Sequence, residues 1–558
     1  MYRNINRKRQ LIVLFLFCIL FICLILRVYN RQVINYEFFK KKADIQHRVK
    51  IELAPERGGI FDRNNRAFAV DTPIESLYAV PREITNKEEV IRSICELIDV
   101  DENIVRERIN KDKAFIWIKR GLSSEETTRI KISKINGLYL LQETKRSYPK
   151  GDLLCHVIGF TDIDNKGIEG IELYYENFLR GKYGWKSFFR DARQNKISSY
   201  EEFLPAKKGY DIILTIDEVI QHTVETEMRE LVKKRKPESA MIIVMSPITG
   251  EIYAMCSYPS YENNQYSKAE KEDLKNRCIT DVYEPGSVFK VLSACADIDT
   301  GKVKPDDMFF CENGQYSVGK RVLHDYHGYG NLSFSQVIQK SSNIGTVKAT
   351  AKIGEDDFYN YLLNFGIGQS TGIDLPGEEN GILRNVRTWT PSDMTTIPMG
   401  QGVSCTTLQL ADALSVVANG GLLMQPYIVK EIRDENGNVI KKFKPKIKKR
   451  VISGKSADTV KEILKGAVQS GTGKKAILNG YYACGKTGTA QKVIGGRYAE
   501  GKYIASFMGF APYKDPELVV VVSVNEPKGD YFGGSVAAPV FREVMQKSLR
   551  YLEVPEES

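Results

Sequence analysis

The first apolar pattern in the chain is an unbroken run of sixteen apolar residues from Leu11 to Leu26. Arg9 and Arg27 flank it, and their long side chains can reach the polar interface and extend a slightly short span. No small-residue cleavage site follows, so the pattern predicts an uncleaved, single membrane-spanning helix. A buried core helix is the alternative, but the position at the chain terminus disfavours it. Basic residues lie on both sides of the run, so the charges alone leave its orientation open.

A second region, residues 51–205, mixes strand-like and helical patterns. Amphipathic stretches at residues 87–98 and 126–135 and a glycine-bounded stretch at residues 167–184 predict helices. Near the start of this region is the segment ERGGIFDRNNRAFAVD, whose paired glycines permit tight backbone geometry. Three of its charged residues could form an ion-pair network: Arg57, Asp62 and Arg63. No nucleophile with a neighbouring base is visible there, so we interpret the segment as a structural clasp.

Downstream of residue 209 the pattern alternates between strands and helices. Strand-like runs occur at residues 210–215, 240–245, 251–257, 503–512 and 518–524. Helical runs occur at residues 288–298, 408–419 and 540–552, and Asp217 caps another. The turn sequence SPITG joins two of the strands as a hairpin. Hairpins at both ends with helices between them predict an α+β domain in which an antiparallel sheet is flanked by helices.

Composition narrows the possible classes of protein without choosing one. The hydrophobic and charged fractions, 42% and 27%, are those of a globular protein, and the net charge of +10 is spread along the chain apart from a lysine-rich stretch at residues 441–450. No fold signature for nucleic acid accompanies the basic residues, so we expect no nucleic-acid partner. Ten cysteines show no CxxC pair, and His324 and His327 are the sole close histidine pair, so neither a metal site nor a disulfide framework is indicated.

The segment YEPGSVFKVLSACADIDTG, residues 283–301, carries the first candidate chemistry. Ser287 and Lys290 are spaced i and i+3 at the start of an apolar helix, so the amine can reach the hydroxyl. A lysine with an ordinary pKa is already protonated at neutral pH and cannot accept a proton. Burial and a nearby helix N-terminus both disfavour the ammonium form, so they can lower the pKa of the lysine enough for it to act as a base. The pair predicts a nucleophile beside its base. Alone, the pair is more typical of a serine that caps a core helix beside a solvent-facing lysine, so two further motifs must support the interpretation as a catalytic site.

Two later motifs could complete such a site. Ser341 and Asn343, in KSSNIGTVKA, offer a hydroxyl that can relay protons and an amide that can hold a peptide carbonyl. The segment CGKTGTA offers a cation and two hydroxyls suited to a carboxylate-terminated peptide, with a glycine that lets a backbone lie against the strand. Its candidate binding residues are Lys486, Thr487, Gly488 and Thr489.

Residues 480–487, GYYACGKT, also match the phosphate-loop pattern GxxxxGK[ST]. A phosphate loop must follow a buried strand and open a helix, yet the residues after Thr487 are punctuated by glycine and strand-like. Nucleotide binding is therefore kept only as a minor alternative, and we expect no cofactor.

Ser-x-x-Lys, Ser-x-Asn and Lys-Thr-Gly in this order resemble the penicillin-recognising serine transferases. The segment RGGIFDRN resembles the N-terminal pedestal motif of class B penicillin-binding proteins, and LTID, SPITGEIYAM, YEPGSVFK, SSNIG, MGQGVS, CGKTGTA and GGSVAAPVF resemble their transpeptidase domain. Glu284 before Pro-Gly-Ser resembles the division branch and its sporulation paralogue. The domains that follow from this resemblance are a tail (1–10), an anchor (11–28), a juxtamembrane segment (29–50), a pedestal or dimerisation domain (51–205) and a transpeptidase domain (210–552).

The resemblance implies a peptidoglycan D,D-transpeptidase of septal wall synthesis that is also acylated by β-lactams. Ser287 would attack the D-Ala-D-Ala carbonyl of a stem peptide, with Lys290 as the base, Ser341 as the proton relay and Asn343 orienting the peptide. Lys486, Thr487 and Thr489 would hold the terminal carboxylate.

The substrate lies outside the cytoplasmic membrane, so the resemblance places the N-terminus inside and the catalytic domain outside. It further implies a separate glycosyltransferase and divisome proteins as partners. A β-lactam sensor without turnover is the rival interpretation.

Overall fold

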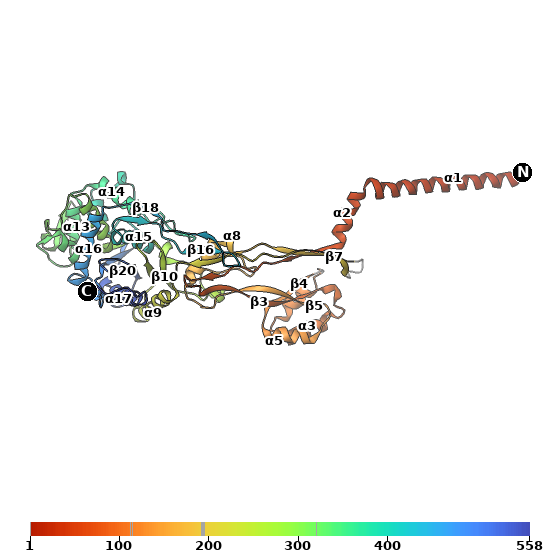
Figure 1. The fold of residues 1–558 in the computed structure, drawn as a ribbon, viewed down its shortest axis with the longest axis horizontal. Coiled ribbons are helices and arrows are strands. Elements are labelled where there is room, and N and C mark those ends of the chain that lie inside the picture. Colours follow the sequence, from red (N-terminus) through yellow and green to blue (C-terminus); the bar gives the residue numbers. More distant parts are fainter. Residues whose placement is uncertain (1, 112, 114, 191–195, 320, 558) are drawn as a thin grey trace. The chain divides into compact units, whose positions relative to one another are not determined.

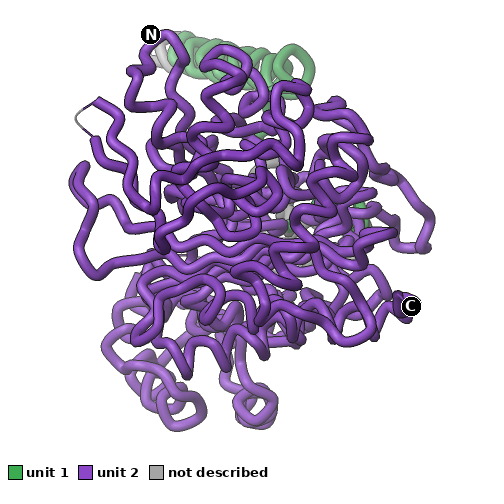
Figure 2. The backbone as a smooth tube through the Cα atoms, turned by 90° about the vertical axis from the view of Figure 1, so that its left-hand side faces the viewer, with its two compact units in different colours: residues 1–56, 181–208 green, residues 57–180, 209–558 purple. Residues whose placement is uncertain are grey.

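The computed structural model describes residues 2–111, 113, 115–190, 196–319 and 321–557, and its elements are labelled in Figure 1. The chain divides into two compact units (Figure 2). Unit 1 consists of Met1–Glu56 and Gly181–Lys208, and unit 2 consists of Arg57–Arg180 and Gly209–Ser558.

Unit 1 contains the predicted membrane helix. The helix α1 (Tyr2–Tyr29) continues into a π-helical turn, η1 (Asn30–Ile34), and is followed by α2 (Tyr36–His47). Residues 7–34 are long and apolar enough to cross a membrane, with a mean hydropathy of 3.2 in their most apolar window. The rest of the unit is an antiparallel sheet in the order β1-β6-β7, formed by Arg48–Leu53, Gly184–Arg190 and Lys196–Leu204.

Unit 2 begins with a seven-stranded sheet in the order β17-β16-β8-β2-β3-β4, in which β5 also pairs with β3. Its strands are β2 (Ile60–Phe61), β3 (Ala67–Ala79), β4 (Ile116–Leu122), β5 (Leu138–Ser147), β8 (Asp211–Leu214), β16 (Val429–Arg433) and β17 (Val439–Lys442). The helices α3 (Lys87–Leu97), α4 (Glu102–Ile109) and α5 (Ser124–Ser133) share a separate apolar core with β3 and β4. The helices predicted at residues 87–98 and 126–135 are therefore confirmed.

The single helix predicted over residues 167–184 is wrong. Two short helices, α7 (Gly170–Tyr174) and α8 (Glu176–Leu179), occupy its first part. Gly181 then takes a left-handed conformation with a φ of +73°, which ends the helical path, and Gly184 starts a strand. The glycines that appeared to bound one helix thus interrupt it.

The clasp segment forms ion pairs, but its partners lie outside it. The Arg57 Nε atom lies 2.6 Å from Glu172, whose other oxygen lies 2.6 Å from the Nε atom of Arg146, and all three side chains are buried. Arg63 pairs with Glu251 at 3.3 Å. The predicted participation of Asp62 in an ion pair is wrong, because its carboxylate instead accepts the N–H groups of three backbone positions: Asn64, Arg66 and Glu218.

Replacing Glu172 by glutamine is expected to lower the free energy of unfolding by about 3–5 kcal/mol, because two buried guanidinium groups lose their shared carboxylate. Urea unfolding of the full-length protein in detergent measures the change. Glu107→Gln removes an exposed ion pair with Lys111 and is expected to leave the free energy of unfolding nearly unchanged, because solvent screens that pair. Equal effects of the two substitutions would contradict the stabilising role assigned to the buried cluster.

The predicted antiparallel sheet flanked by helices forms the centre of unit 2, so the α+β class is confirmed. The sheet order is β10-β9-β21-β20-β19, and every neighbouring pair is antiparallel. Its strands are β9 (Ser239–Met245), β10 (Ile252–Tyr258), β19 (Cys484–Ile494), β20 (Arg497–Ala511) and β21 (Leu518–Asn525). The predicted SPITG hairpin is β9 and β10, and the strand pair at residues 503–524 is β20 and β21.

Helices cover both faces of this sheet (Figure 1). The helices α9 (Glu218–Arg235) and α17 (Gly533–Tyr551) pack on one face, and α15 (Thr407–Ala418) and α16 (Gly454–Gln469) pack on the other. As a consequence, side chains on both faces of the sheet are buried. In strand β21, Val519 and Val521 belong to one apolar core, and Val520 and Val522 belong to the other. The last helix begins at Gly533, seven residues before its predicted start, and carries Pro539 inside it.

The remaining elements are short. The helices are α6 (Cys155–Ile158), α10 (Arg277–Thr280), α11 (Lys290–Asp299), α12 (Phe334–Lys340), α13 (Asn343–Thr350) and α14 (Glu355–Asn364). The strands are β11 (Met308–Phe310), β12 (Gln315–Val318), β13 (Arg321–His324), β14 (Asn331–Ser333), β15 (Leu422–Met424) and β18 (Ile447–Arg450).

Candidate active site

Ser287 lies in a 3-10 turn, η4 (Gly286–Phe289), that leads directly into α11. Gly286 has a φ of +59° and donates its N–H to the carbonyl of Gly400 at 3.0 Å, which anchors the turn. The Ser287 side chain is half-buried, whereas Lys290, at the first turn of α11, is fully buried. The apolar helix predicted after Ser287 is thus confirmed.

The Lys290 amine joins the first motif to the second. Its Nζ atom lies 2.7 Å from the carbonyl oxygen of Ser341, 3.3 Å from the Ser341 hydroxyl and 2.7 Å from the Asn343 Oδ1 atom. Burial lowers the pKa of Lys290 to about 7, while the Asp325 carboxylate acts in the opposite direction. A substantial fraction of the amine is therefore neutral near pH 7 and able to accept a proton.

The second motif is a turn between α12 and α13. Ser341 takes a left-handed conformation with a φ of +61°, and Asn343 is the first residue of α13. The Asn343 Nδ2 group donates to the carbonyl of His324 at 2.8 Å, so the amide oxygen is directed to Lys290. The Asp325 carboxylate accepts hydrogen bonds from the Ser342 hydroxyl at 2.6 Å and from the backbone N–H groups of the next two residues.

Asp325 was not identified from the sequence. It precedes Asn343 by 18 residues and belongs to no recognisable motif. The local sequence HDYHGYG does not distinguish an aspartate that caps a distant helix from one that faces solvent. The sequence draws attention to His324 only as the neighbour of His327, whereas in the structure the backbone carbonyl of His324 accepts a hydrogen bond from the Asn343 side chain. Among the described residues, no group of three His, Cys, Asp or Glu side chains lies close enough to hold a metal ion.

The third motif lies on β19, the edge strand of the central sheet. Lys486 is buried, and both burial and the neighbouring charge of Lys290 lower its pKa well below the ordinary value. Thr487 and Thr489 lie on the opposite face of the strand. Their hydroxyl oxygens contact the Thr472 hydroxyl at 2.7 Å and the N–H of Gly533 at 3.1 Å, respectively.

Close packing joins β19 to the serine turn. A Cβ atom at Gly488 would lie 2.9 Å from a methyl of Val288 and 3.1 Å from the carbonyl of Pro285. A Cβ atom at Gly286 would lie 3.0 Å from the side chain of Ala490. The three motifs therefore converge around Lys290 although they are far apart in the sequence.

The phosphate-loop alternative is wrong. Lys486 and Thr487 lie within β19, which continues as a strand to Ile494, so no helix N-terminus follows the lysine. The dipole and the free N–H groups that bind phosphate are consequently missing from this segment.

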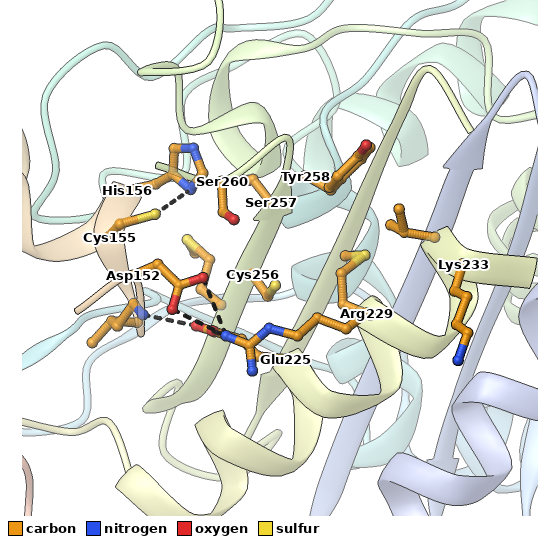
Figure 3. Close-up of a pocket in the computed structure, with 14 residues that line it drawn as sticks. Asp152, Cys155, His156, Glu225, Arg229, Lys233, Cys256, Ser257, Tyr258 and Ser260 are labelled. Carbon is orange, nitrogen blue, oxygen red and sulfur yellow. Dashed lines mark hydrogen bonds and ion pairs between the residues drawn. The ribbon is translucent and has the colours of Figure 1, made fainter. Parts of the chain in front are cut away.

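A separate cavity of about 240 Å³ lies away from the three motifs (Figure 3). Arg229 bridges the carboxylates of Asp152 and Glu225 there, and burial raises the pKa of Glu225 to about 7. The Cys155 sulfur lies 3.4 Å from the His156 Nδ1 atom. This pair lacks the character of a reactive thiolate, because burial raises the pKa of the thiol and lowers that of His156 to about 4.

Comparisons with known proteins agree with this geometry. Residues 240–546 match the model of the penicillin binding protein transpeptidase domain, and residues 52–214 match that of the penicillin-binding protein dimerisation domain. Stage V sporulation protein D of Bacillus subtilis is 36% identical over 98% of this chain and 86% of its own length. Peptidoglycan D,D-transpeptidase FtsI of Escherichia coli is 31% identical over 95% of this chain and 89% of its own length.

A solved structure, penicillin binding protein 3 of Mycobacterium tuberculosis complexed with aztreonam, has a TM-score of 0.72 and 26% identity, and the match covers 91% of this chain and 98% of that one. With the transpeptidase model spanning more than half of the residues and full-length relatives above 30% identity, the chain belongs to the penicillin-binding protein transpeptidase family.

Proposed function

We propose that this protein is a serine-type peptidoglycan D,D-transpeptidase that cross-links stem peptides and is acylated by β-lactams. The observation that carries the proposal is the Lys290 amine, which is buried, has a pKa of about 7 and contacts both Ser341 and Asn343. A neutral amine in that position is the base that a serine nucleophile needs.

In the acylation step, the Ser287 oxygen forms a bond to the carbonyl carbon of the penultimate D-Ala, and the bond from that carbon to the terminal D-Ala nitrogen breaks. The serine proton passes to Lys290, and the Ser341 hydroxyl, 3.3 Å from that amine, relays a proton to the leaving nitrogen. The backbone N–H groups of Ser287 and Thr489 stabilise the oxyanion, each contributing about 3 kcal/mol.

In the second step, the amine of a neighbouring stem peptide attacks the acyl-enzyme. The new amide bond forms as the ester bond to Ser287 breaks, and the proton of the attacking amine returns to the serine oxygen through Lys290. Lys486, Thr487 and Thr489 hold the terminal carboxylate of the donor. The Thr489 oxygen already accepts a hydrogen bond from Gly533, so its own proton is available to a ligand.

The substrate exists outside the cytoplasmic membrane, so we place the tail of residues 1–10 inside and the catalytic domain outside. The protein would act in septal wall synthesis, in division or in spore formation, since Glu284 before Pro-Gly-Ser resembles the division branch and a relative named for sporulation is similar over nearly the whole chain. It would depend on a separate glycosyltransferase to polymerise the glycan strands and on other division proteins.

Release of D-alanine separates a transpeptidase from a β-lactam sensor. Full-length protein in detergent, supplied with a lipid-linked disaccharide pentapeptide and a separate polymerase, is expected to form cross-linked dimers and to release one D-alanine per cross-link. Both signals should disappear when penicillin is added first. Penicillin labelling of the protein without any D-alanine release from this substrate would favour the sensor.

A further inference from the structure

We propose that Asp325 is a positioning residue for the reaction: it fixes the turn of the second motif so that Ser341 and Asn343 face the Lys290 amine. This inference rests on the proposed function, because it assigns Asp325 to the same site. Among the described residues, Asp325 makes no hydrogen bond to Lys290 or to any residue of β19. The hydrogen bonds of its carboxylate all go to the turn, so it acts through the turn.

The hydrogen bonds of Asp325 converge on three consecutive residues. Its Oδ2 atom accepts from the Ser342 hydroxyl at 2.6 Å, and its Oδ1 atom accepts from the backbone N–H groups of Asn343 and Ile344. These N–H groups begin α13 and have no partner inside the helix. A carboxylate at this end is also favoured by the helix dipole.

By holding the backbone at the start of α13, Asp325 also determines the positions of Ser341 and of the Asn343 side chain. Ser341, directly before the capped residues, is a non-glycine residue with a φ of +61°, a conformation that the surrounding structure must impose. The Asn343 amide is fixed at both ends, with its nitrogen on the His324 carbonyl and its oxygen on Lys290. His324 is the last residue of β13 and Asp325 follows it directly, so the end of this strand holds both the backbone and the side chain of Asn343.

Asp325 also contributes charge to the environment of Lys290. The groups that face the amine are the neutral side chains of Ser341 and Asn343 from the turn, the Lys486 amine from β19 and the carboxylate of Asp325. Burial disfavours the ammonium form of Lys290 and lowers its pKa, whereas the Asp325 carboxylate stabilises that form and acts in the opposite direction. Removing only the charge of Asp325 therefore shifts the Lys290 titration to lower pH.

Two substitutions separate the roles. In Asp325→Asn the side-chain oxygen can still accept the two backbone N–H groups, and the amide nitrogen can donate to the Ser342 hydroxyl, so the turn is kept while the charge is lost. Asp325→Ala removes the cap as well. Asp356→Asn is the matched control, since Asp356 lies on α14 and is exposed.

The test is the pH dependence of the second-order rate of acylation by fluorescent penicillin, measured with full-length protein in detergent. For Asp325→Asn, we expect the acid limb to move down by about half a pH unit or more, with a plateau rate near that of the wild type. For Asp325→Ala, we expect the same shift and a plateau rate lowered at least about tenfold. The control should match the wild type throughout.

An unchanged acid limb in Asp325→Asn, or a plateau rate in Asp325→Ala equal to that of the wild type, would overturn the inference. Thermal unfolding of each variant identifies loss of folding. If the alanine variant does not fold, Asp325→Glu takes its place, because it keeps the charge but moves the carboxylate away from the turn; its plateau rate should also fall, and a plateau rate equal to that of the wild type would overturn the inference. A wild-type protein that penicillin does not label at all would instead refute the proposed function, so the two failures are distinguishable.

Discussion

Replacement of Ser287 by alanine is expected to lower the rate of covalent labelling by fluorescent penicillin by at least about 10⁴-fold, because the atom that forms the acyl bond is lost. The side chain is half-buried in a 3-10 turn, and alanine fits there without new contacts, so the fold should be retained. Gel fluorescence of full-length protein in detergent, followed over time, measures the rate.

The matched control is Ser370→Ala, which removes an exposed hydroxyl that is not part of the site. It should be labelled at the wild-type rate. Labelling of Ser287→Ala at a rate similar to that of this control would show that another residue is the nucleophile.

The second large effect is expected for Lys290→Met, which keeps a side chain of similar length in a fully buried position but removes the base. Acylation should slow by about 10²–10⁴-fold, the usual contribution of a positioned general base. The exposed Lys304→Met variant is the control and should react normally.

The pH profile of the wild type gives the same base an independent test. Burial lowers the pKa of Lys290 to about 7, and only the neutral amine can accept the serine proton. The acylation rate should therefore rise as the pH increases through about 7 and then level off. In Lys290→Met this rise should disappear, and a rise that persists in the variant would assign the titration to another group.

Much of the fold could be predicted from the sequence because the central elements have strong patterns. The strands β9 and β21 are continuous apolar runs between turn residues, as expected for strands covered by helices on both faces. The helix around Lys290 is apolar nearly all round, and the structure buries it. In each case the local pattern and the burial in the folded protein favour the same element.

The wrong predictions occur where local signals are ambiguous. Glycines at both ends of residues 167–184 are typical of helix boundaries, but Gly181 and Gly184 instead serve a turn and a strand. At the last helix, the paired glycines and Pro539 are poor helix formers, yet packing on β20 and β21 extends the helix back to Gly533.

Contacts between distant residues account for the rest of what the sequence did not reveal. Arg57 binds Glu172, which is 115 residues away, and Asp325 caps a helix that begins 18 residues later. The three motifs could be listed from the sequence, but their convergence on the Lys290 amine follows from the packing of η4 against β19 and of α11 against α13.

The most direct test of the central claim is the location of the acyl group. Full-length protein is treated with penicillin in detergent and digested with trypsin, which should release the peptide of residues 278–290 because Arg277 precedes it and Lys290 ends it. Fragment masses should place the penicilloyl adduct on Ser287. An adduct on any other residue, with peptide 278–290 unmodified, would contradict the assignment of Ser287 as the nucleophile.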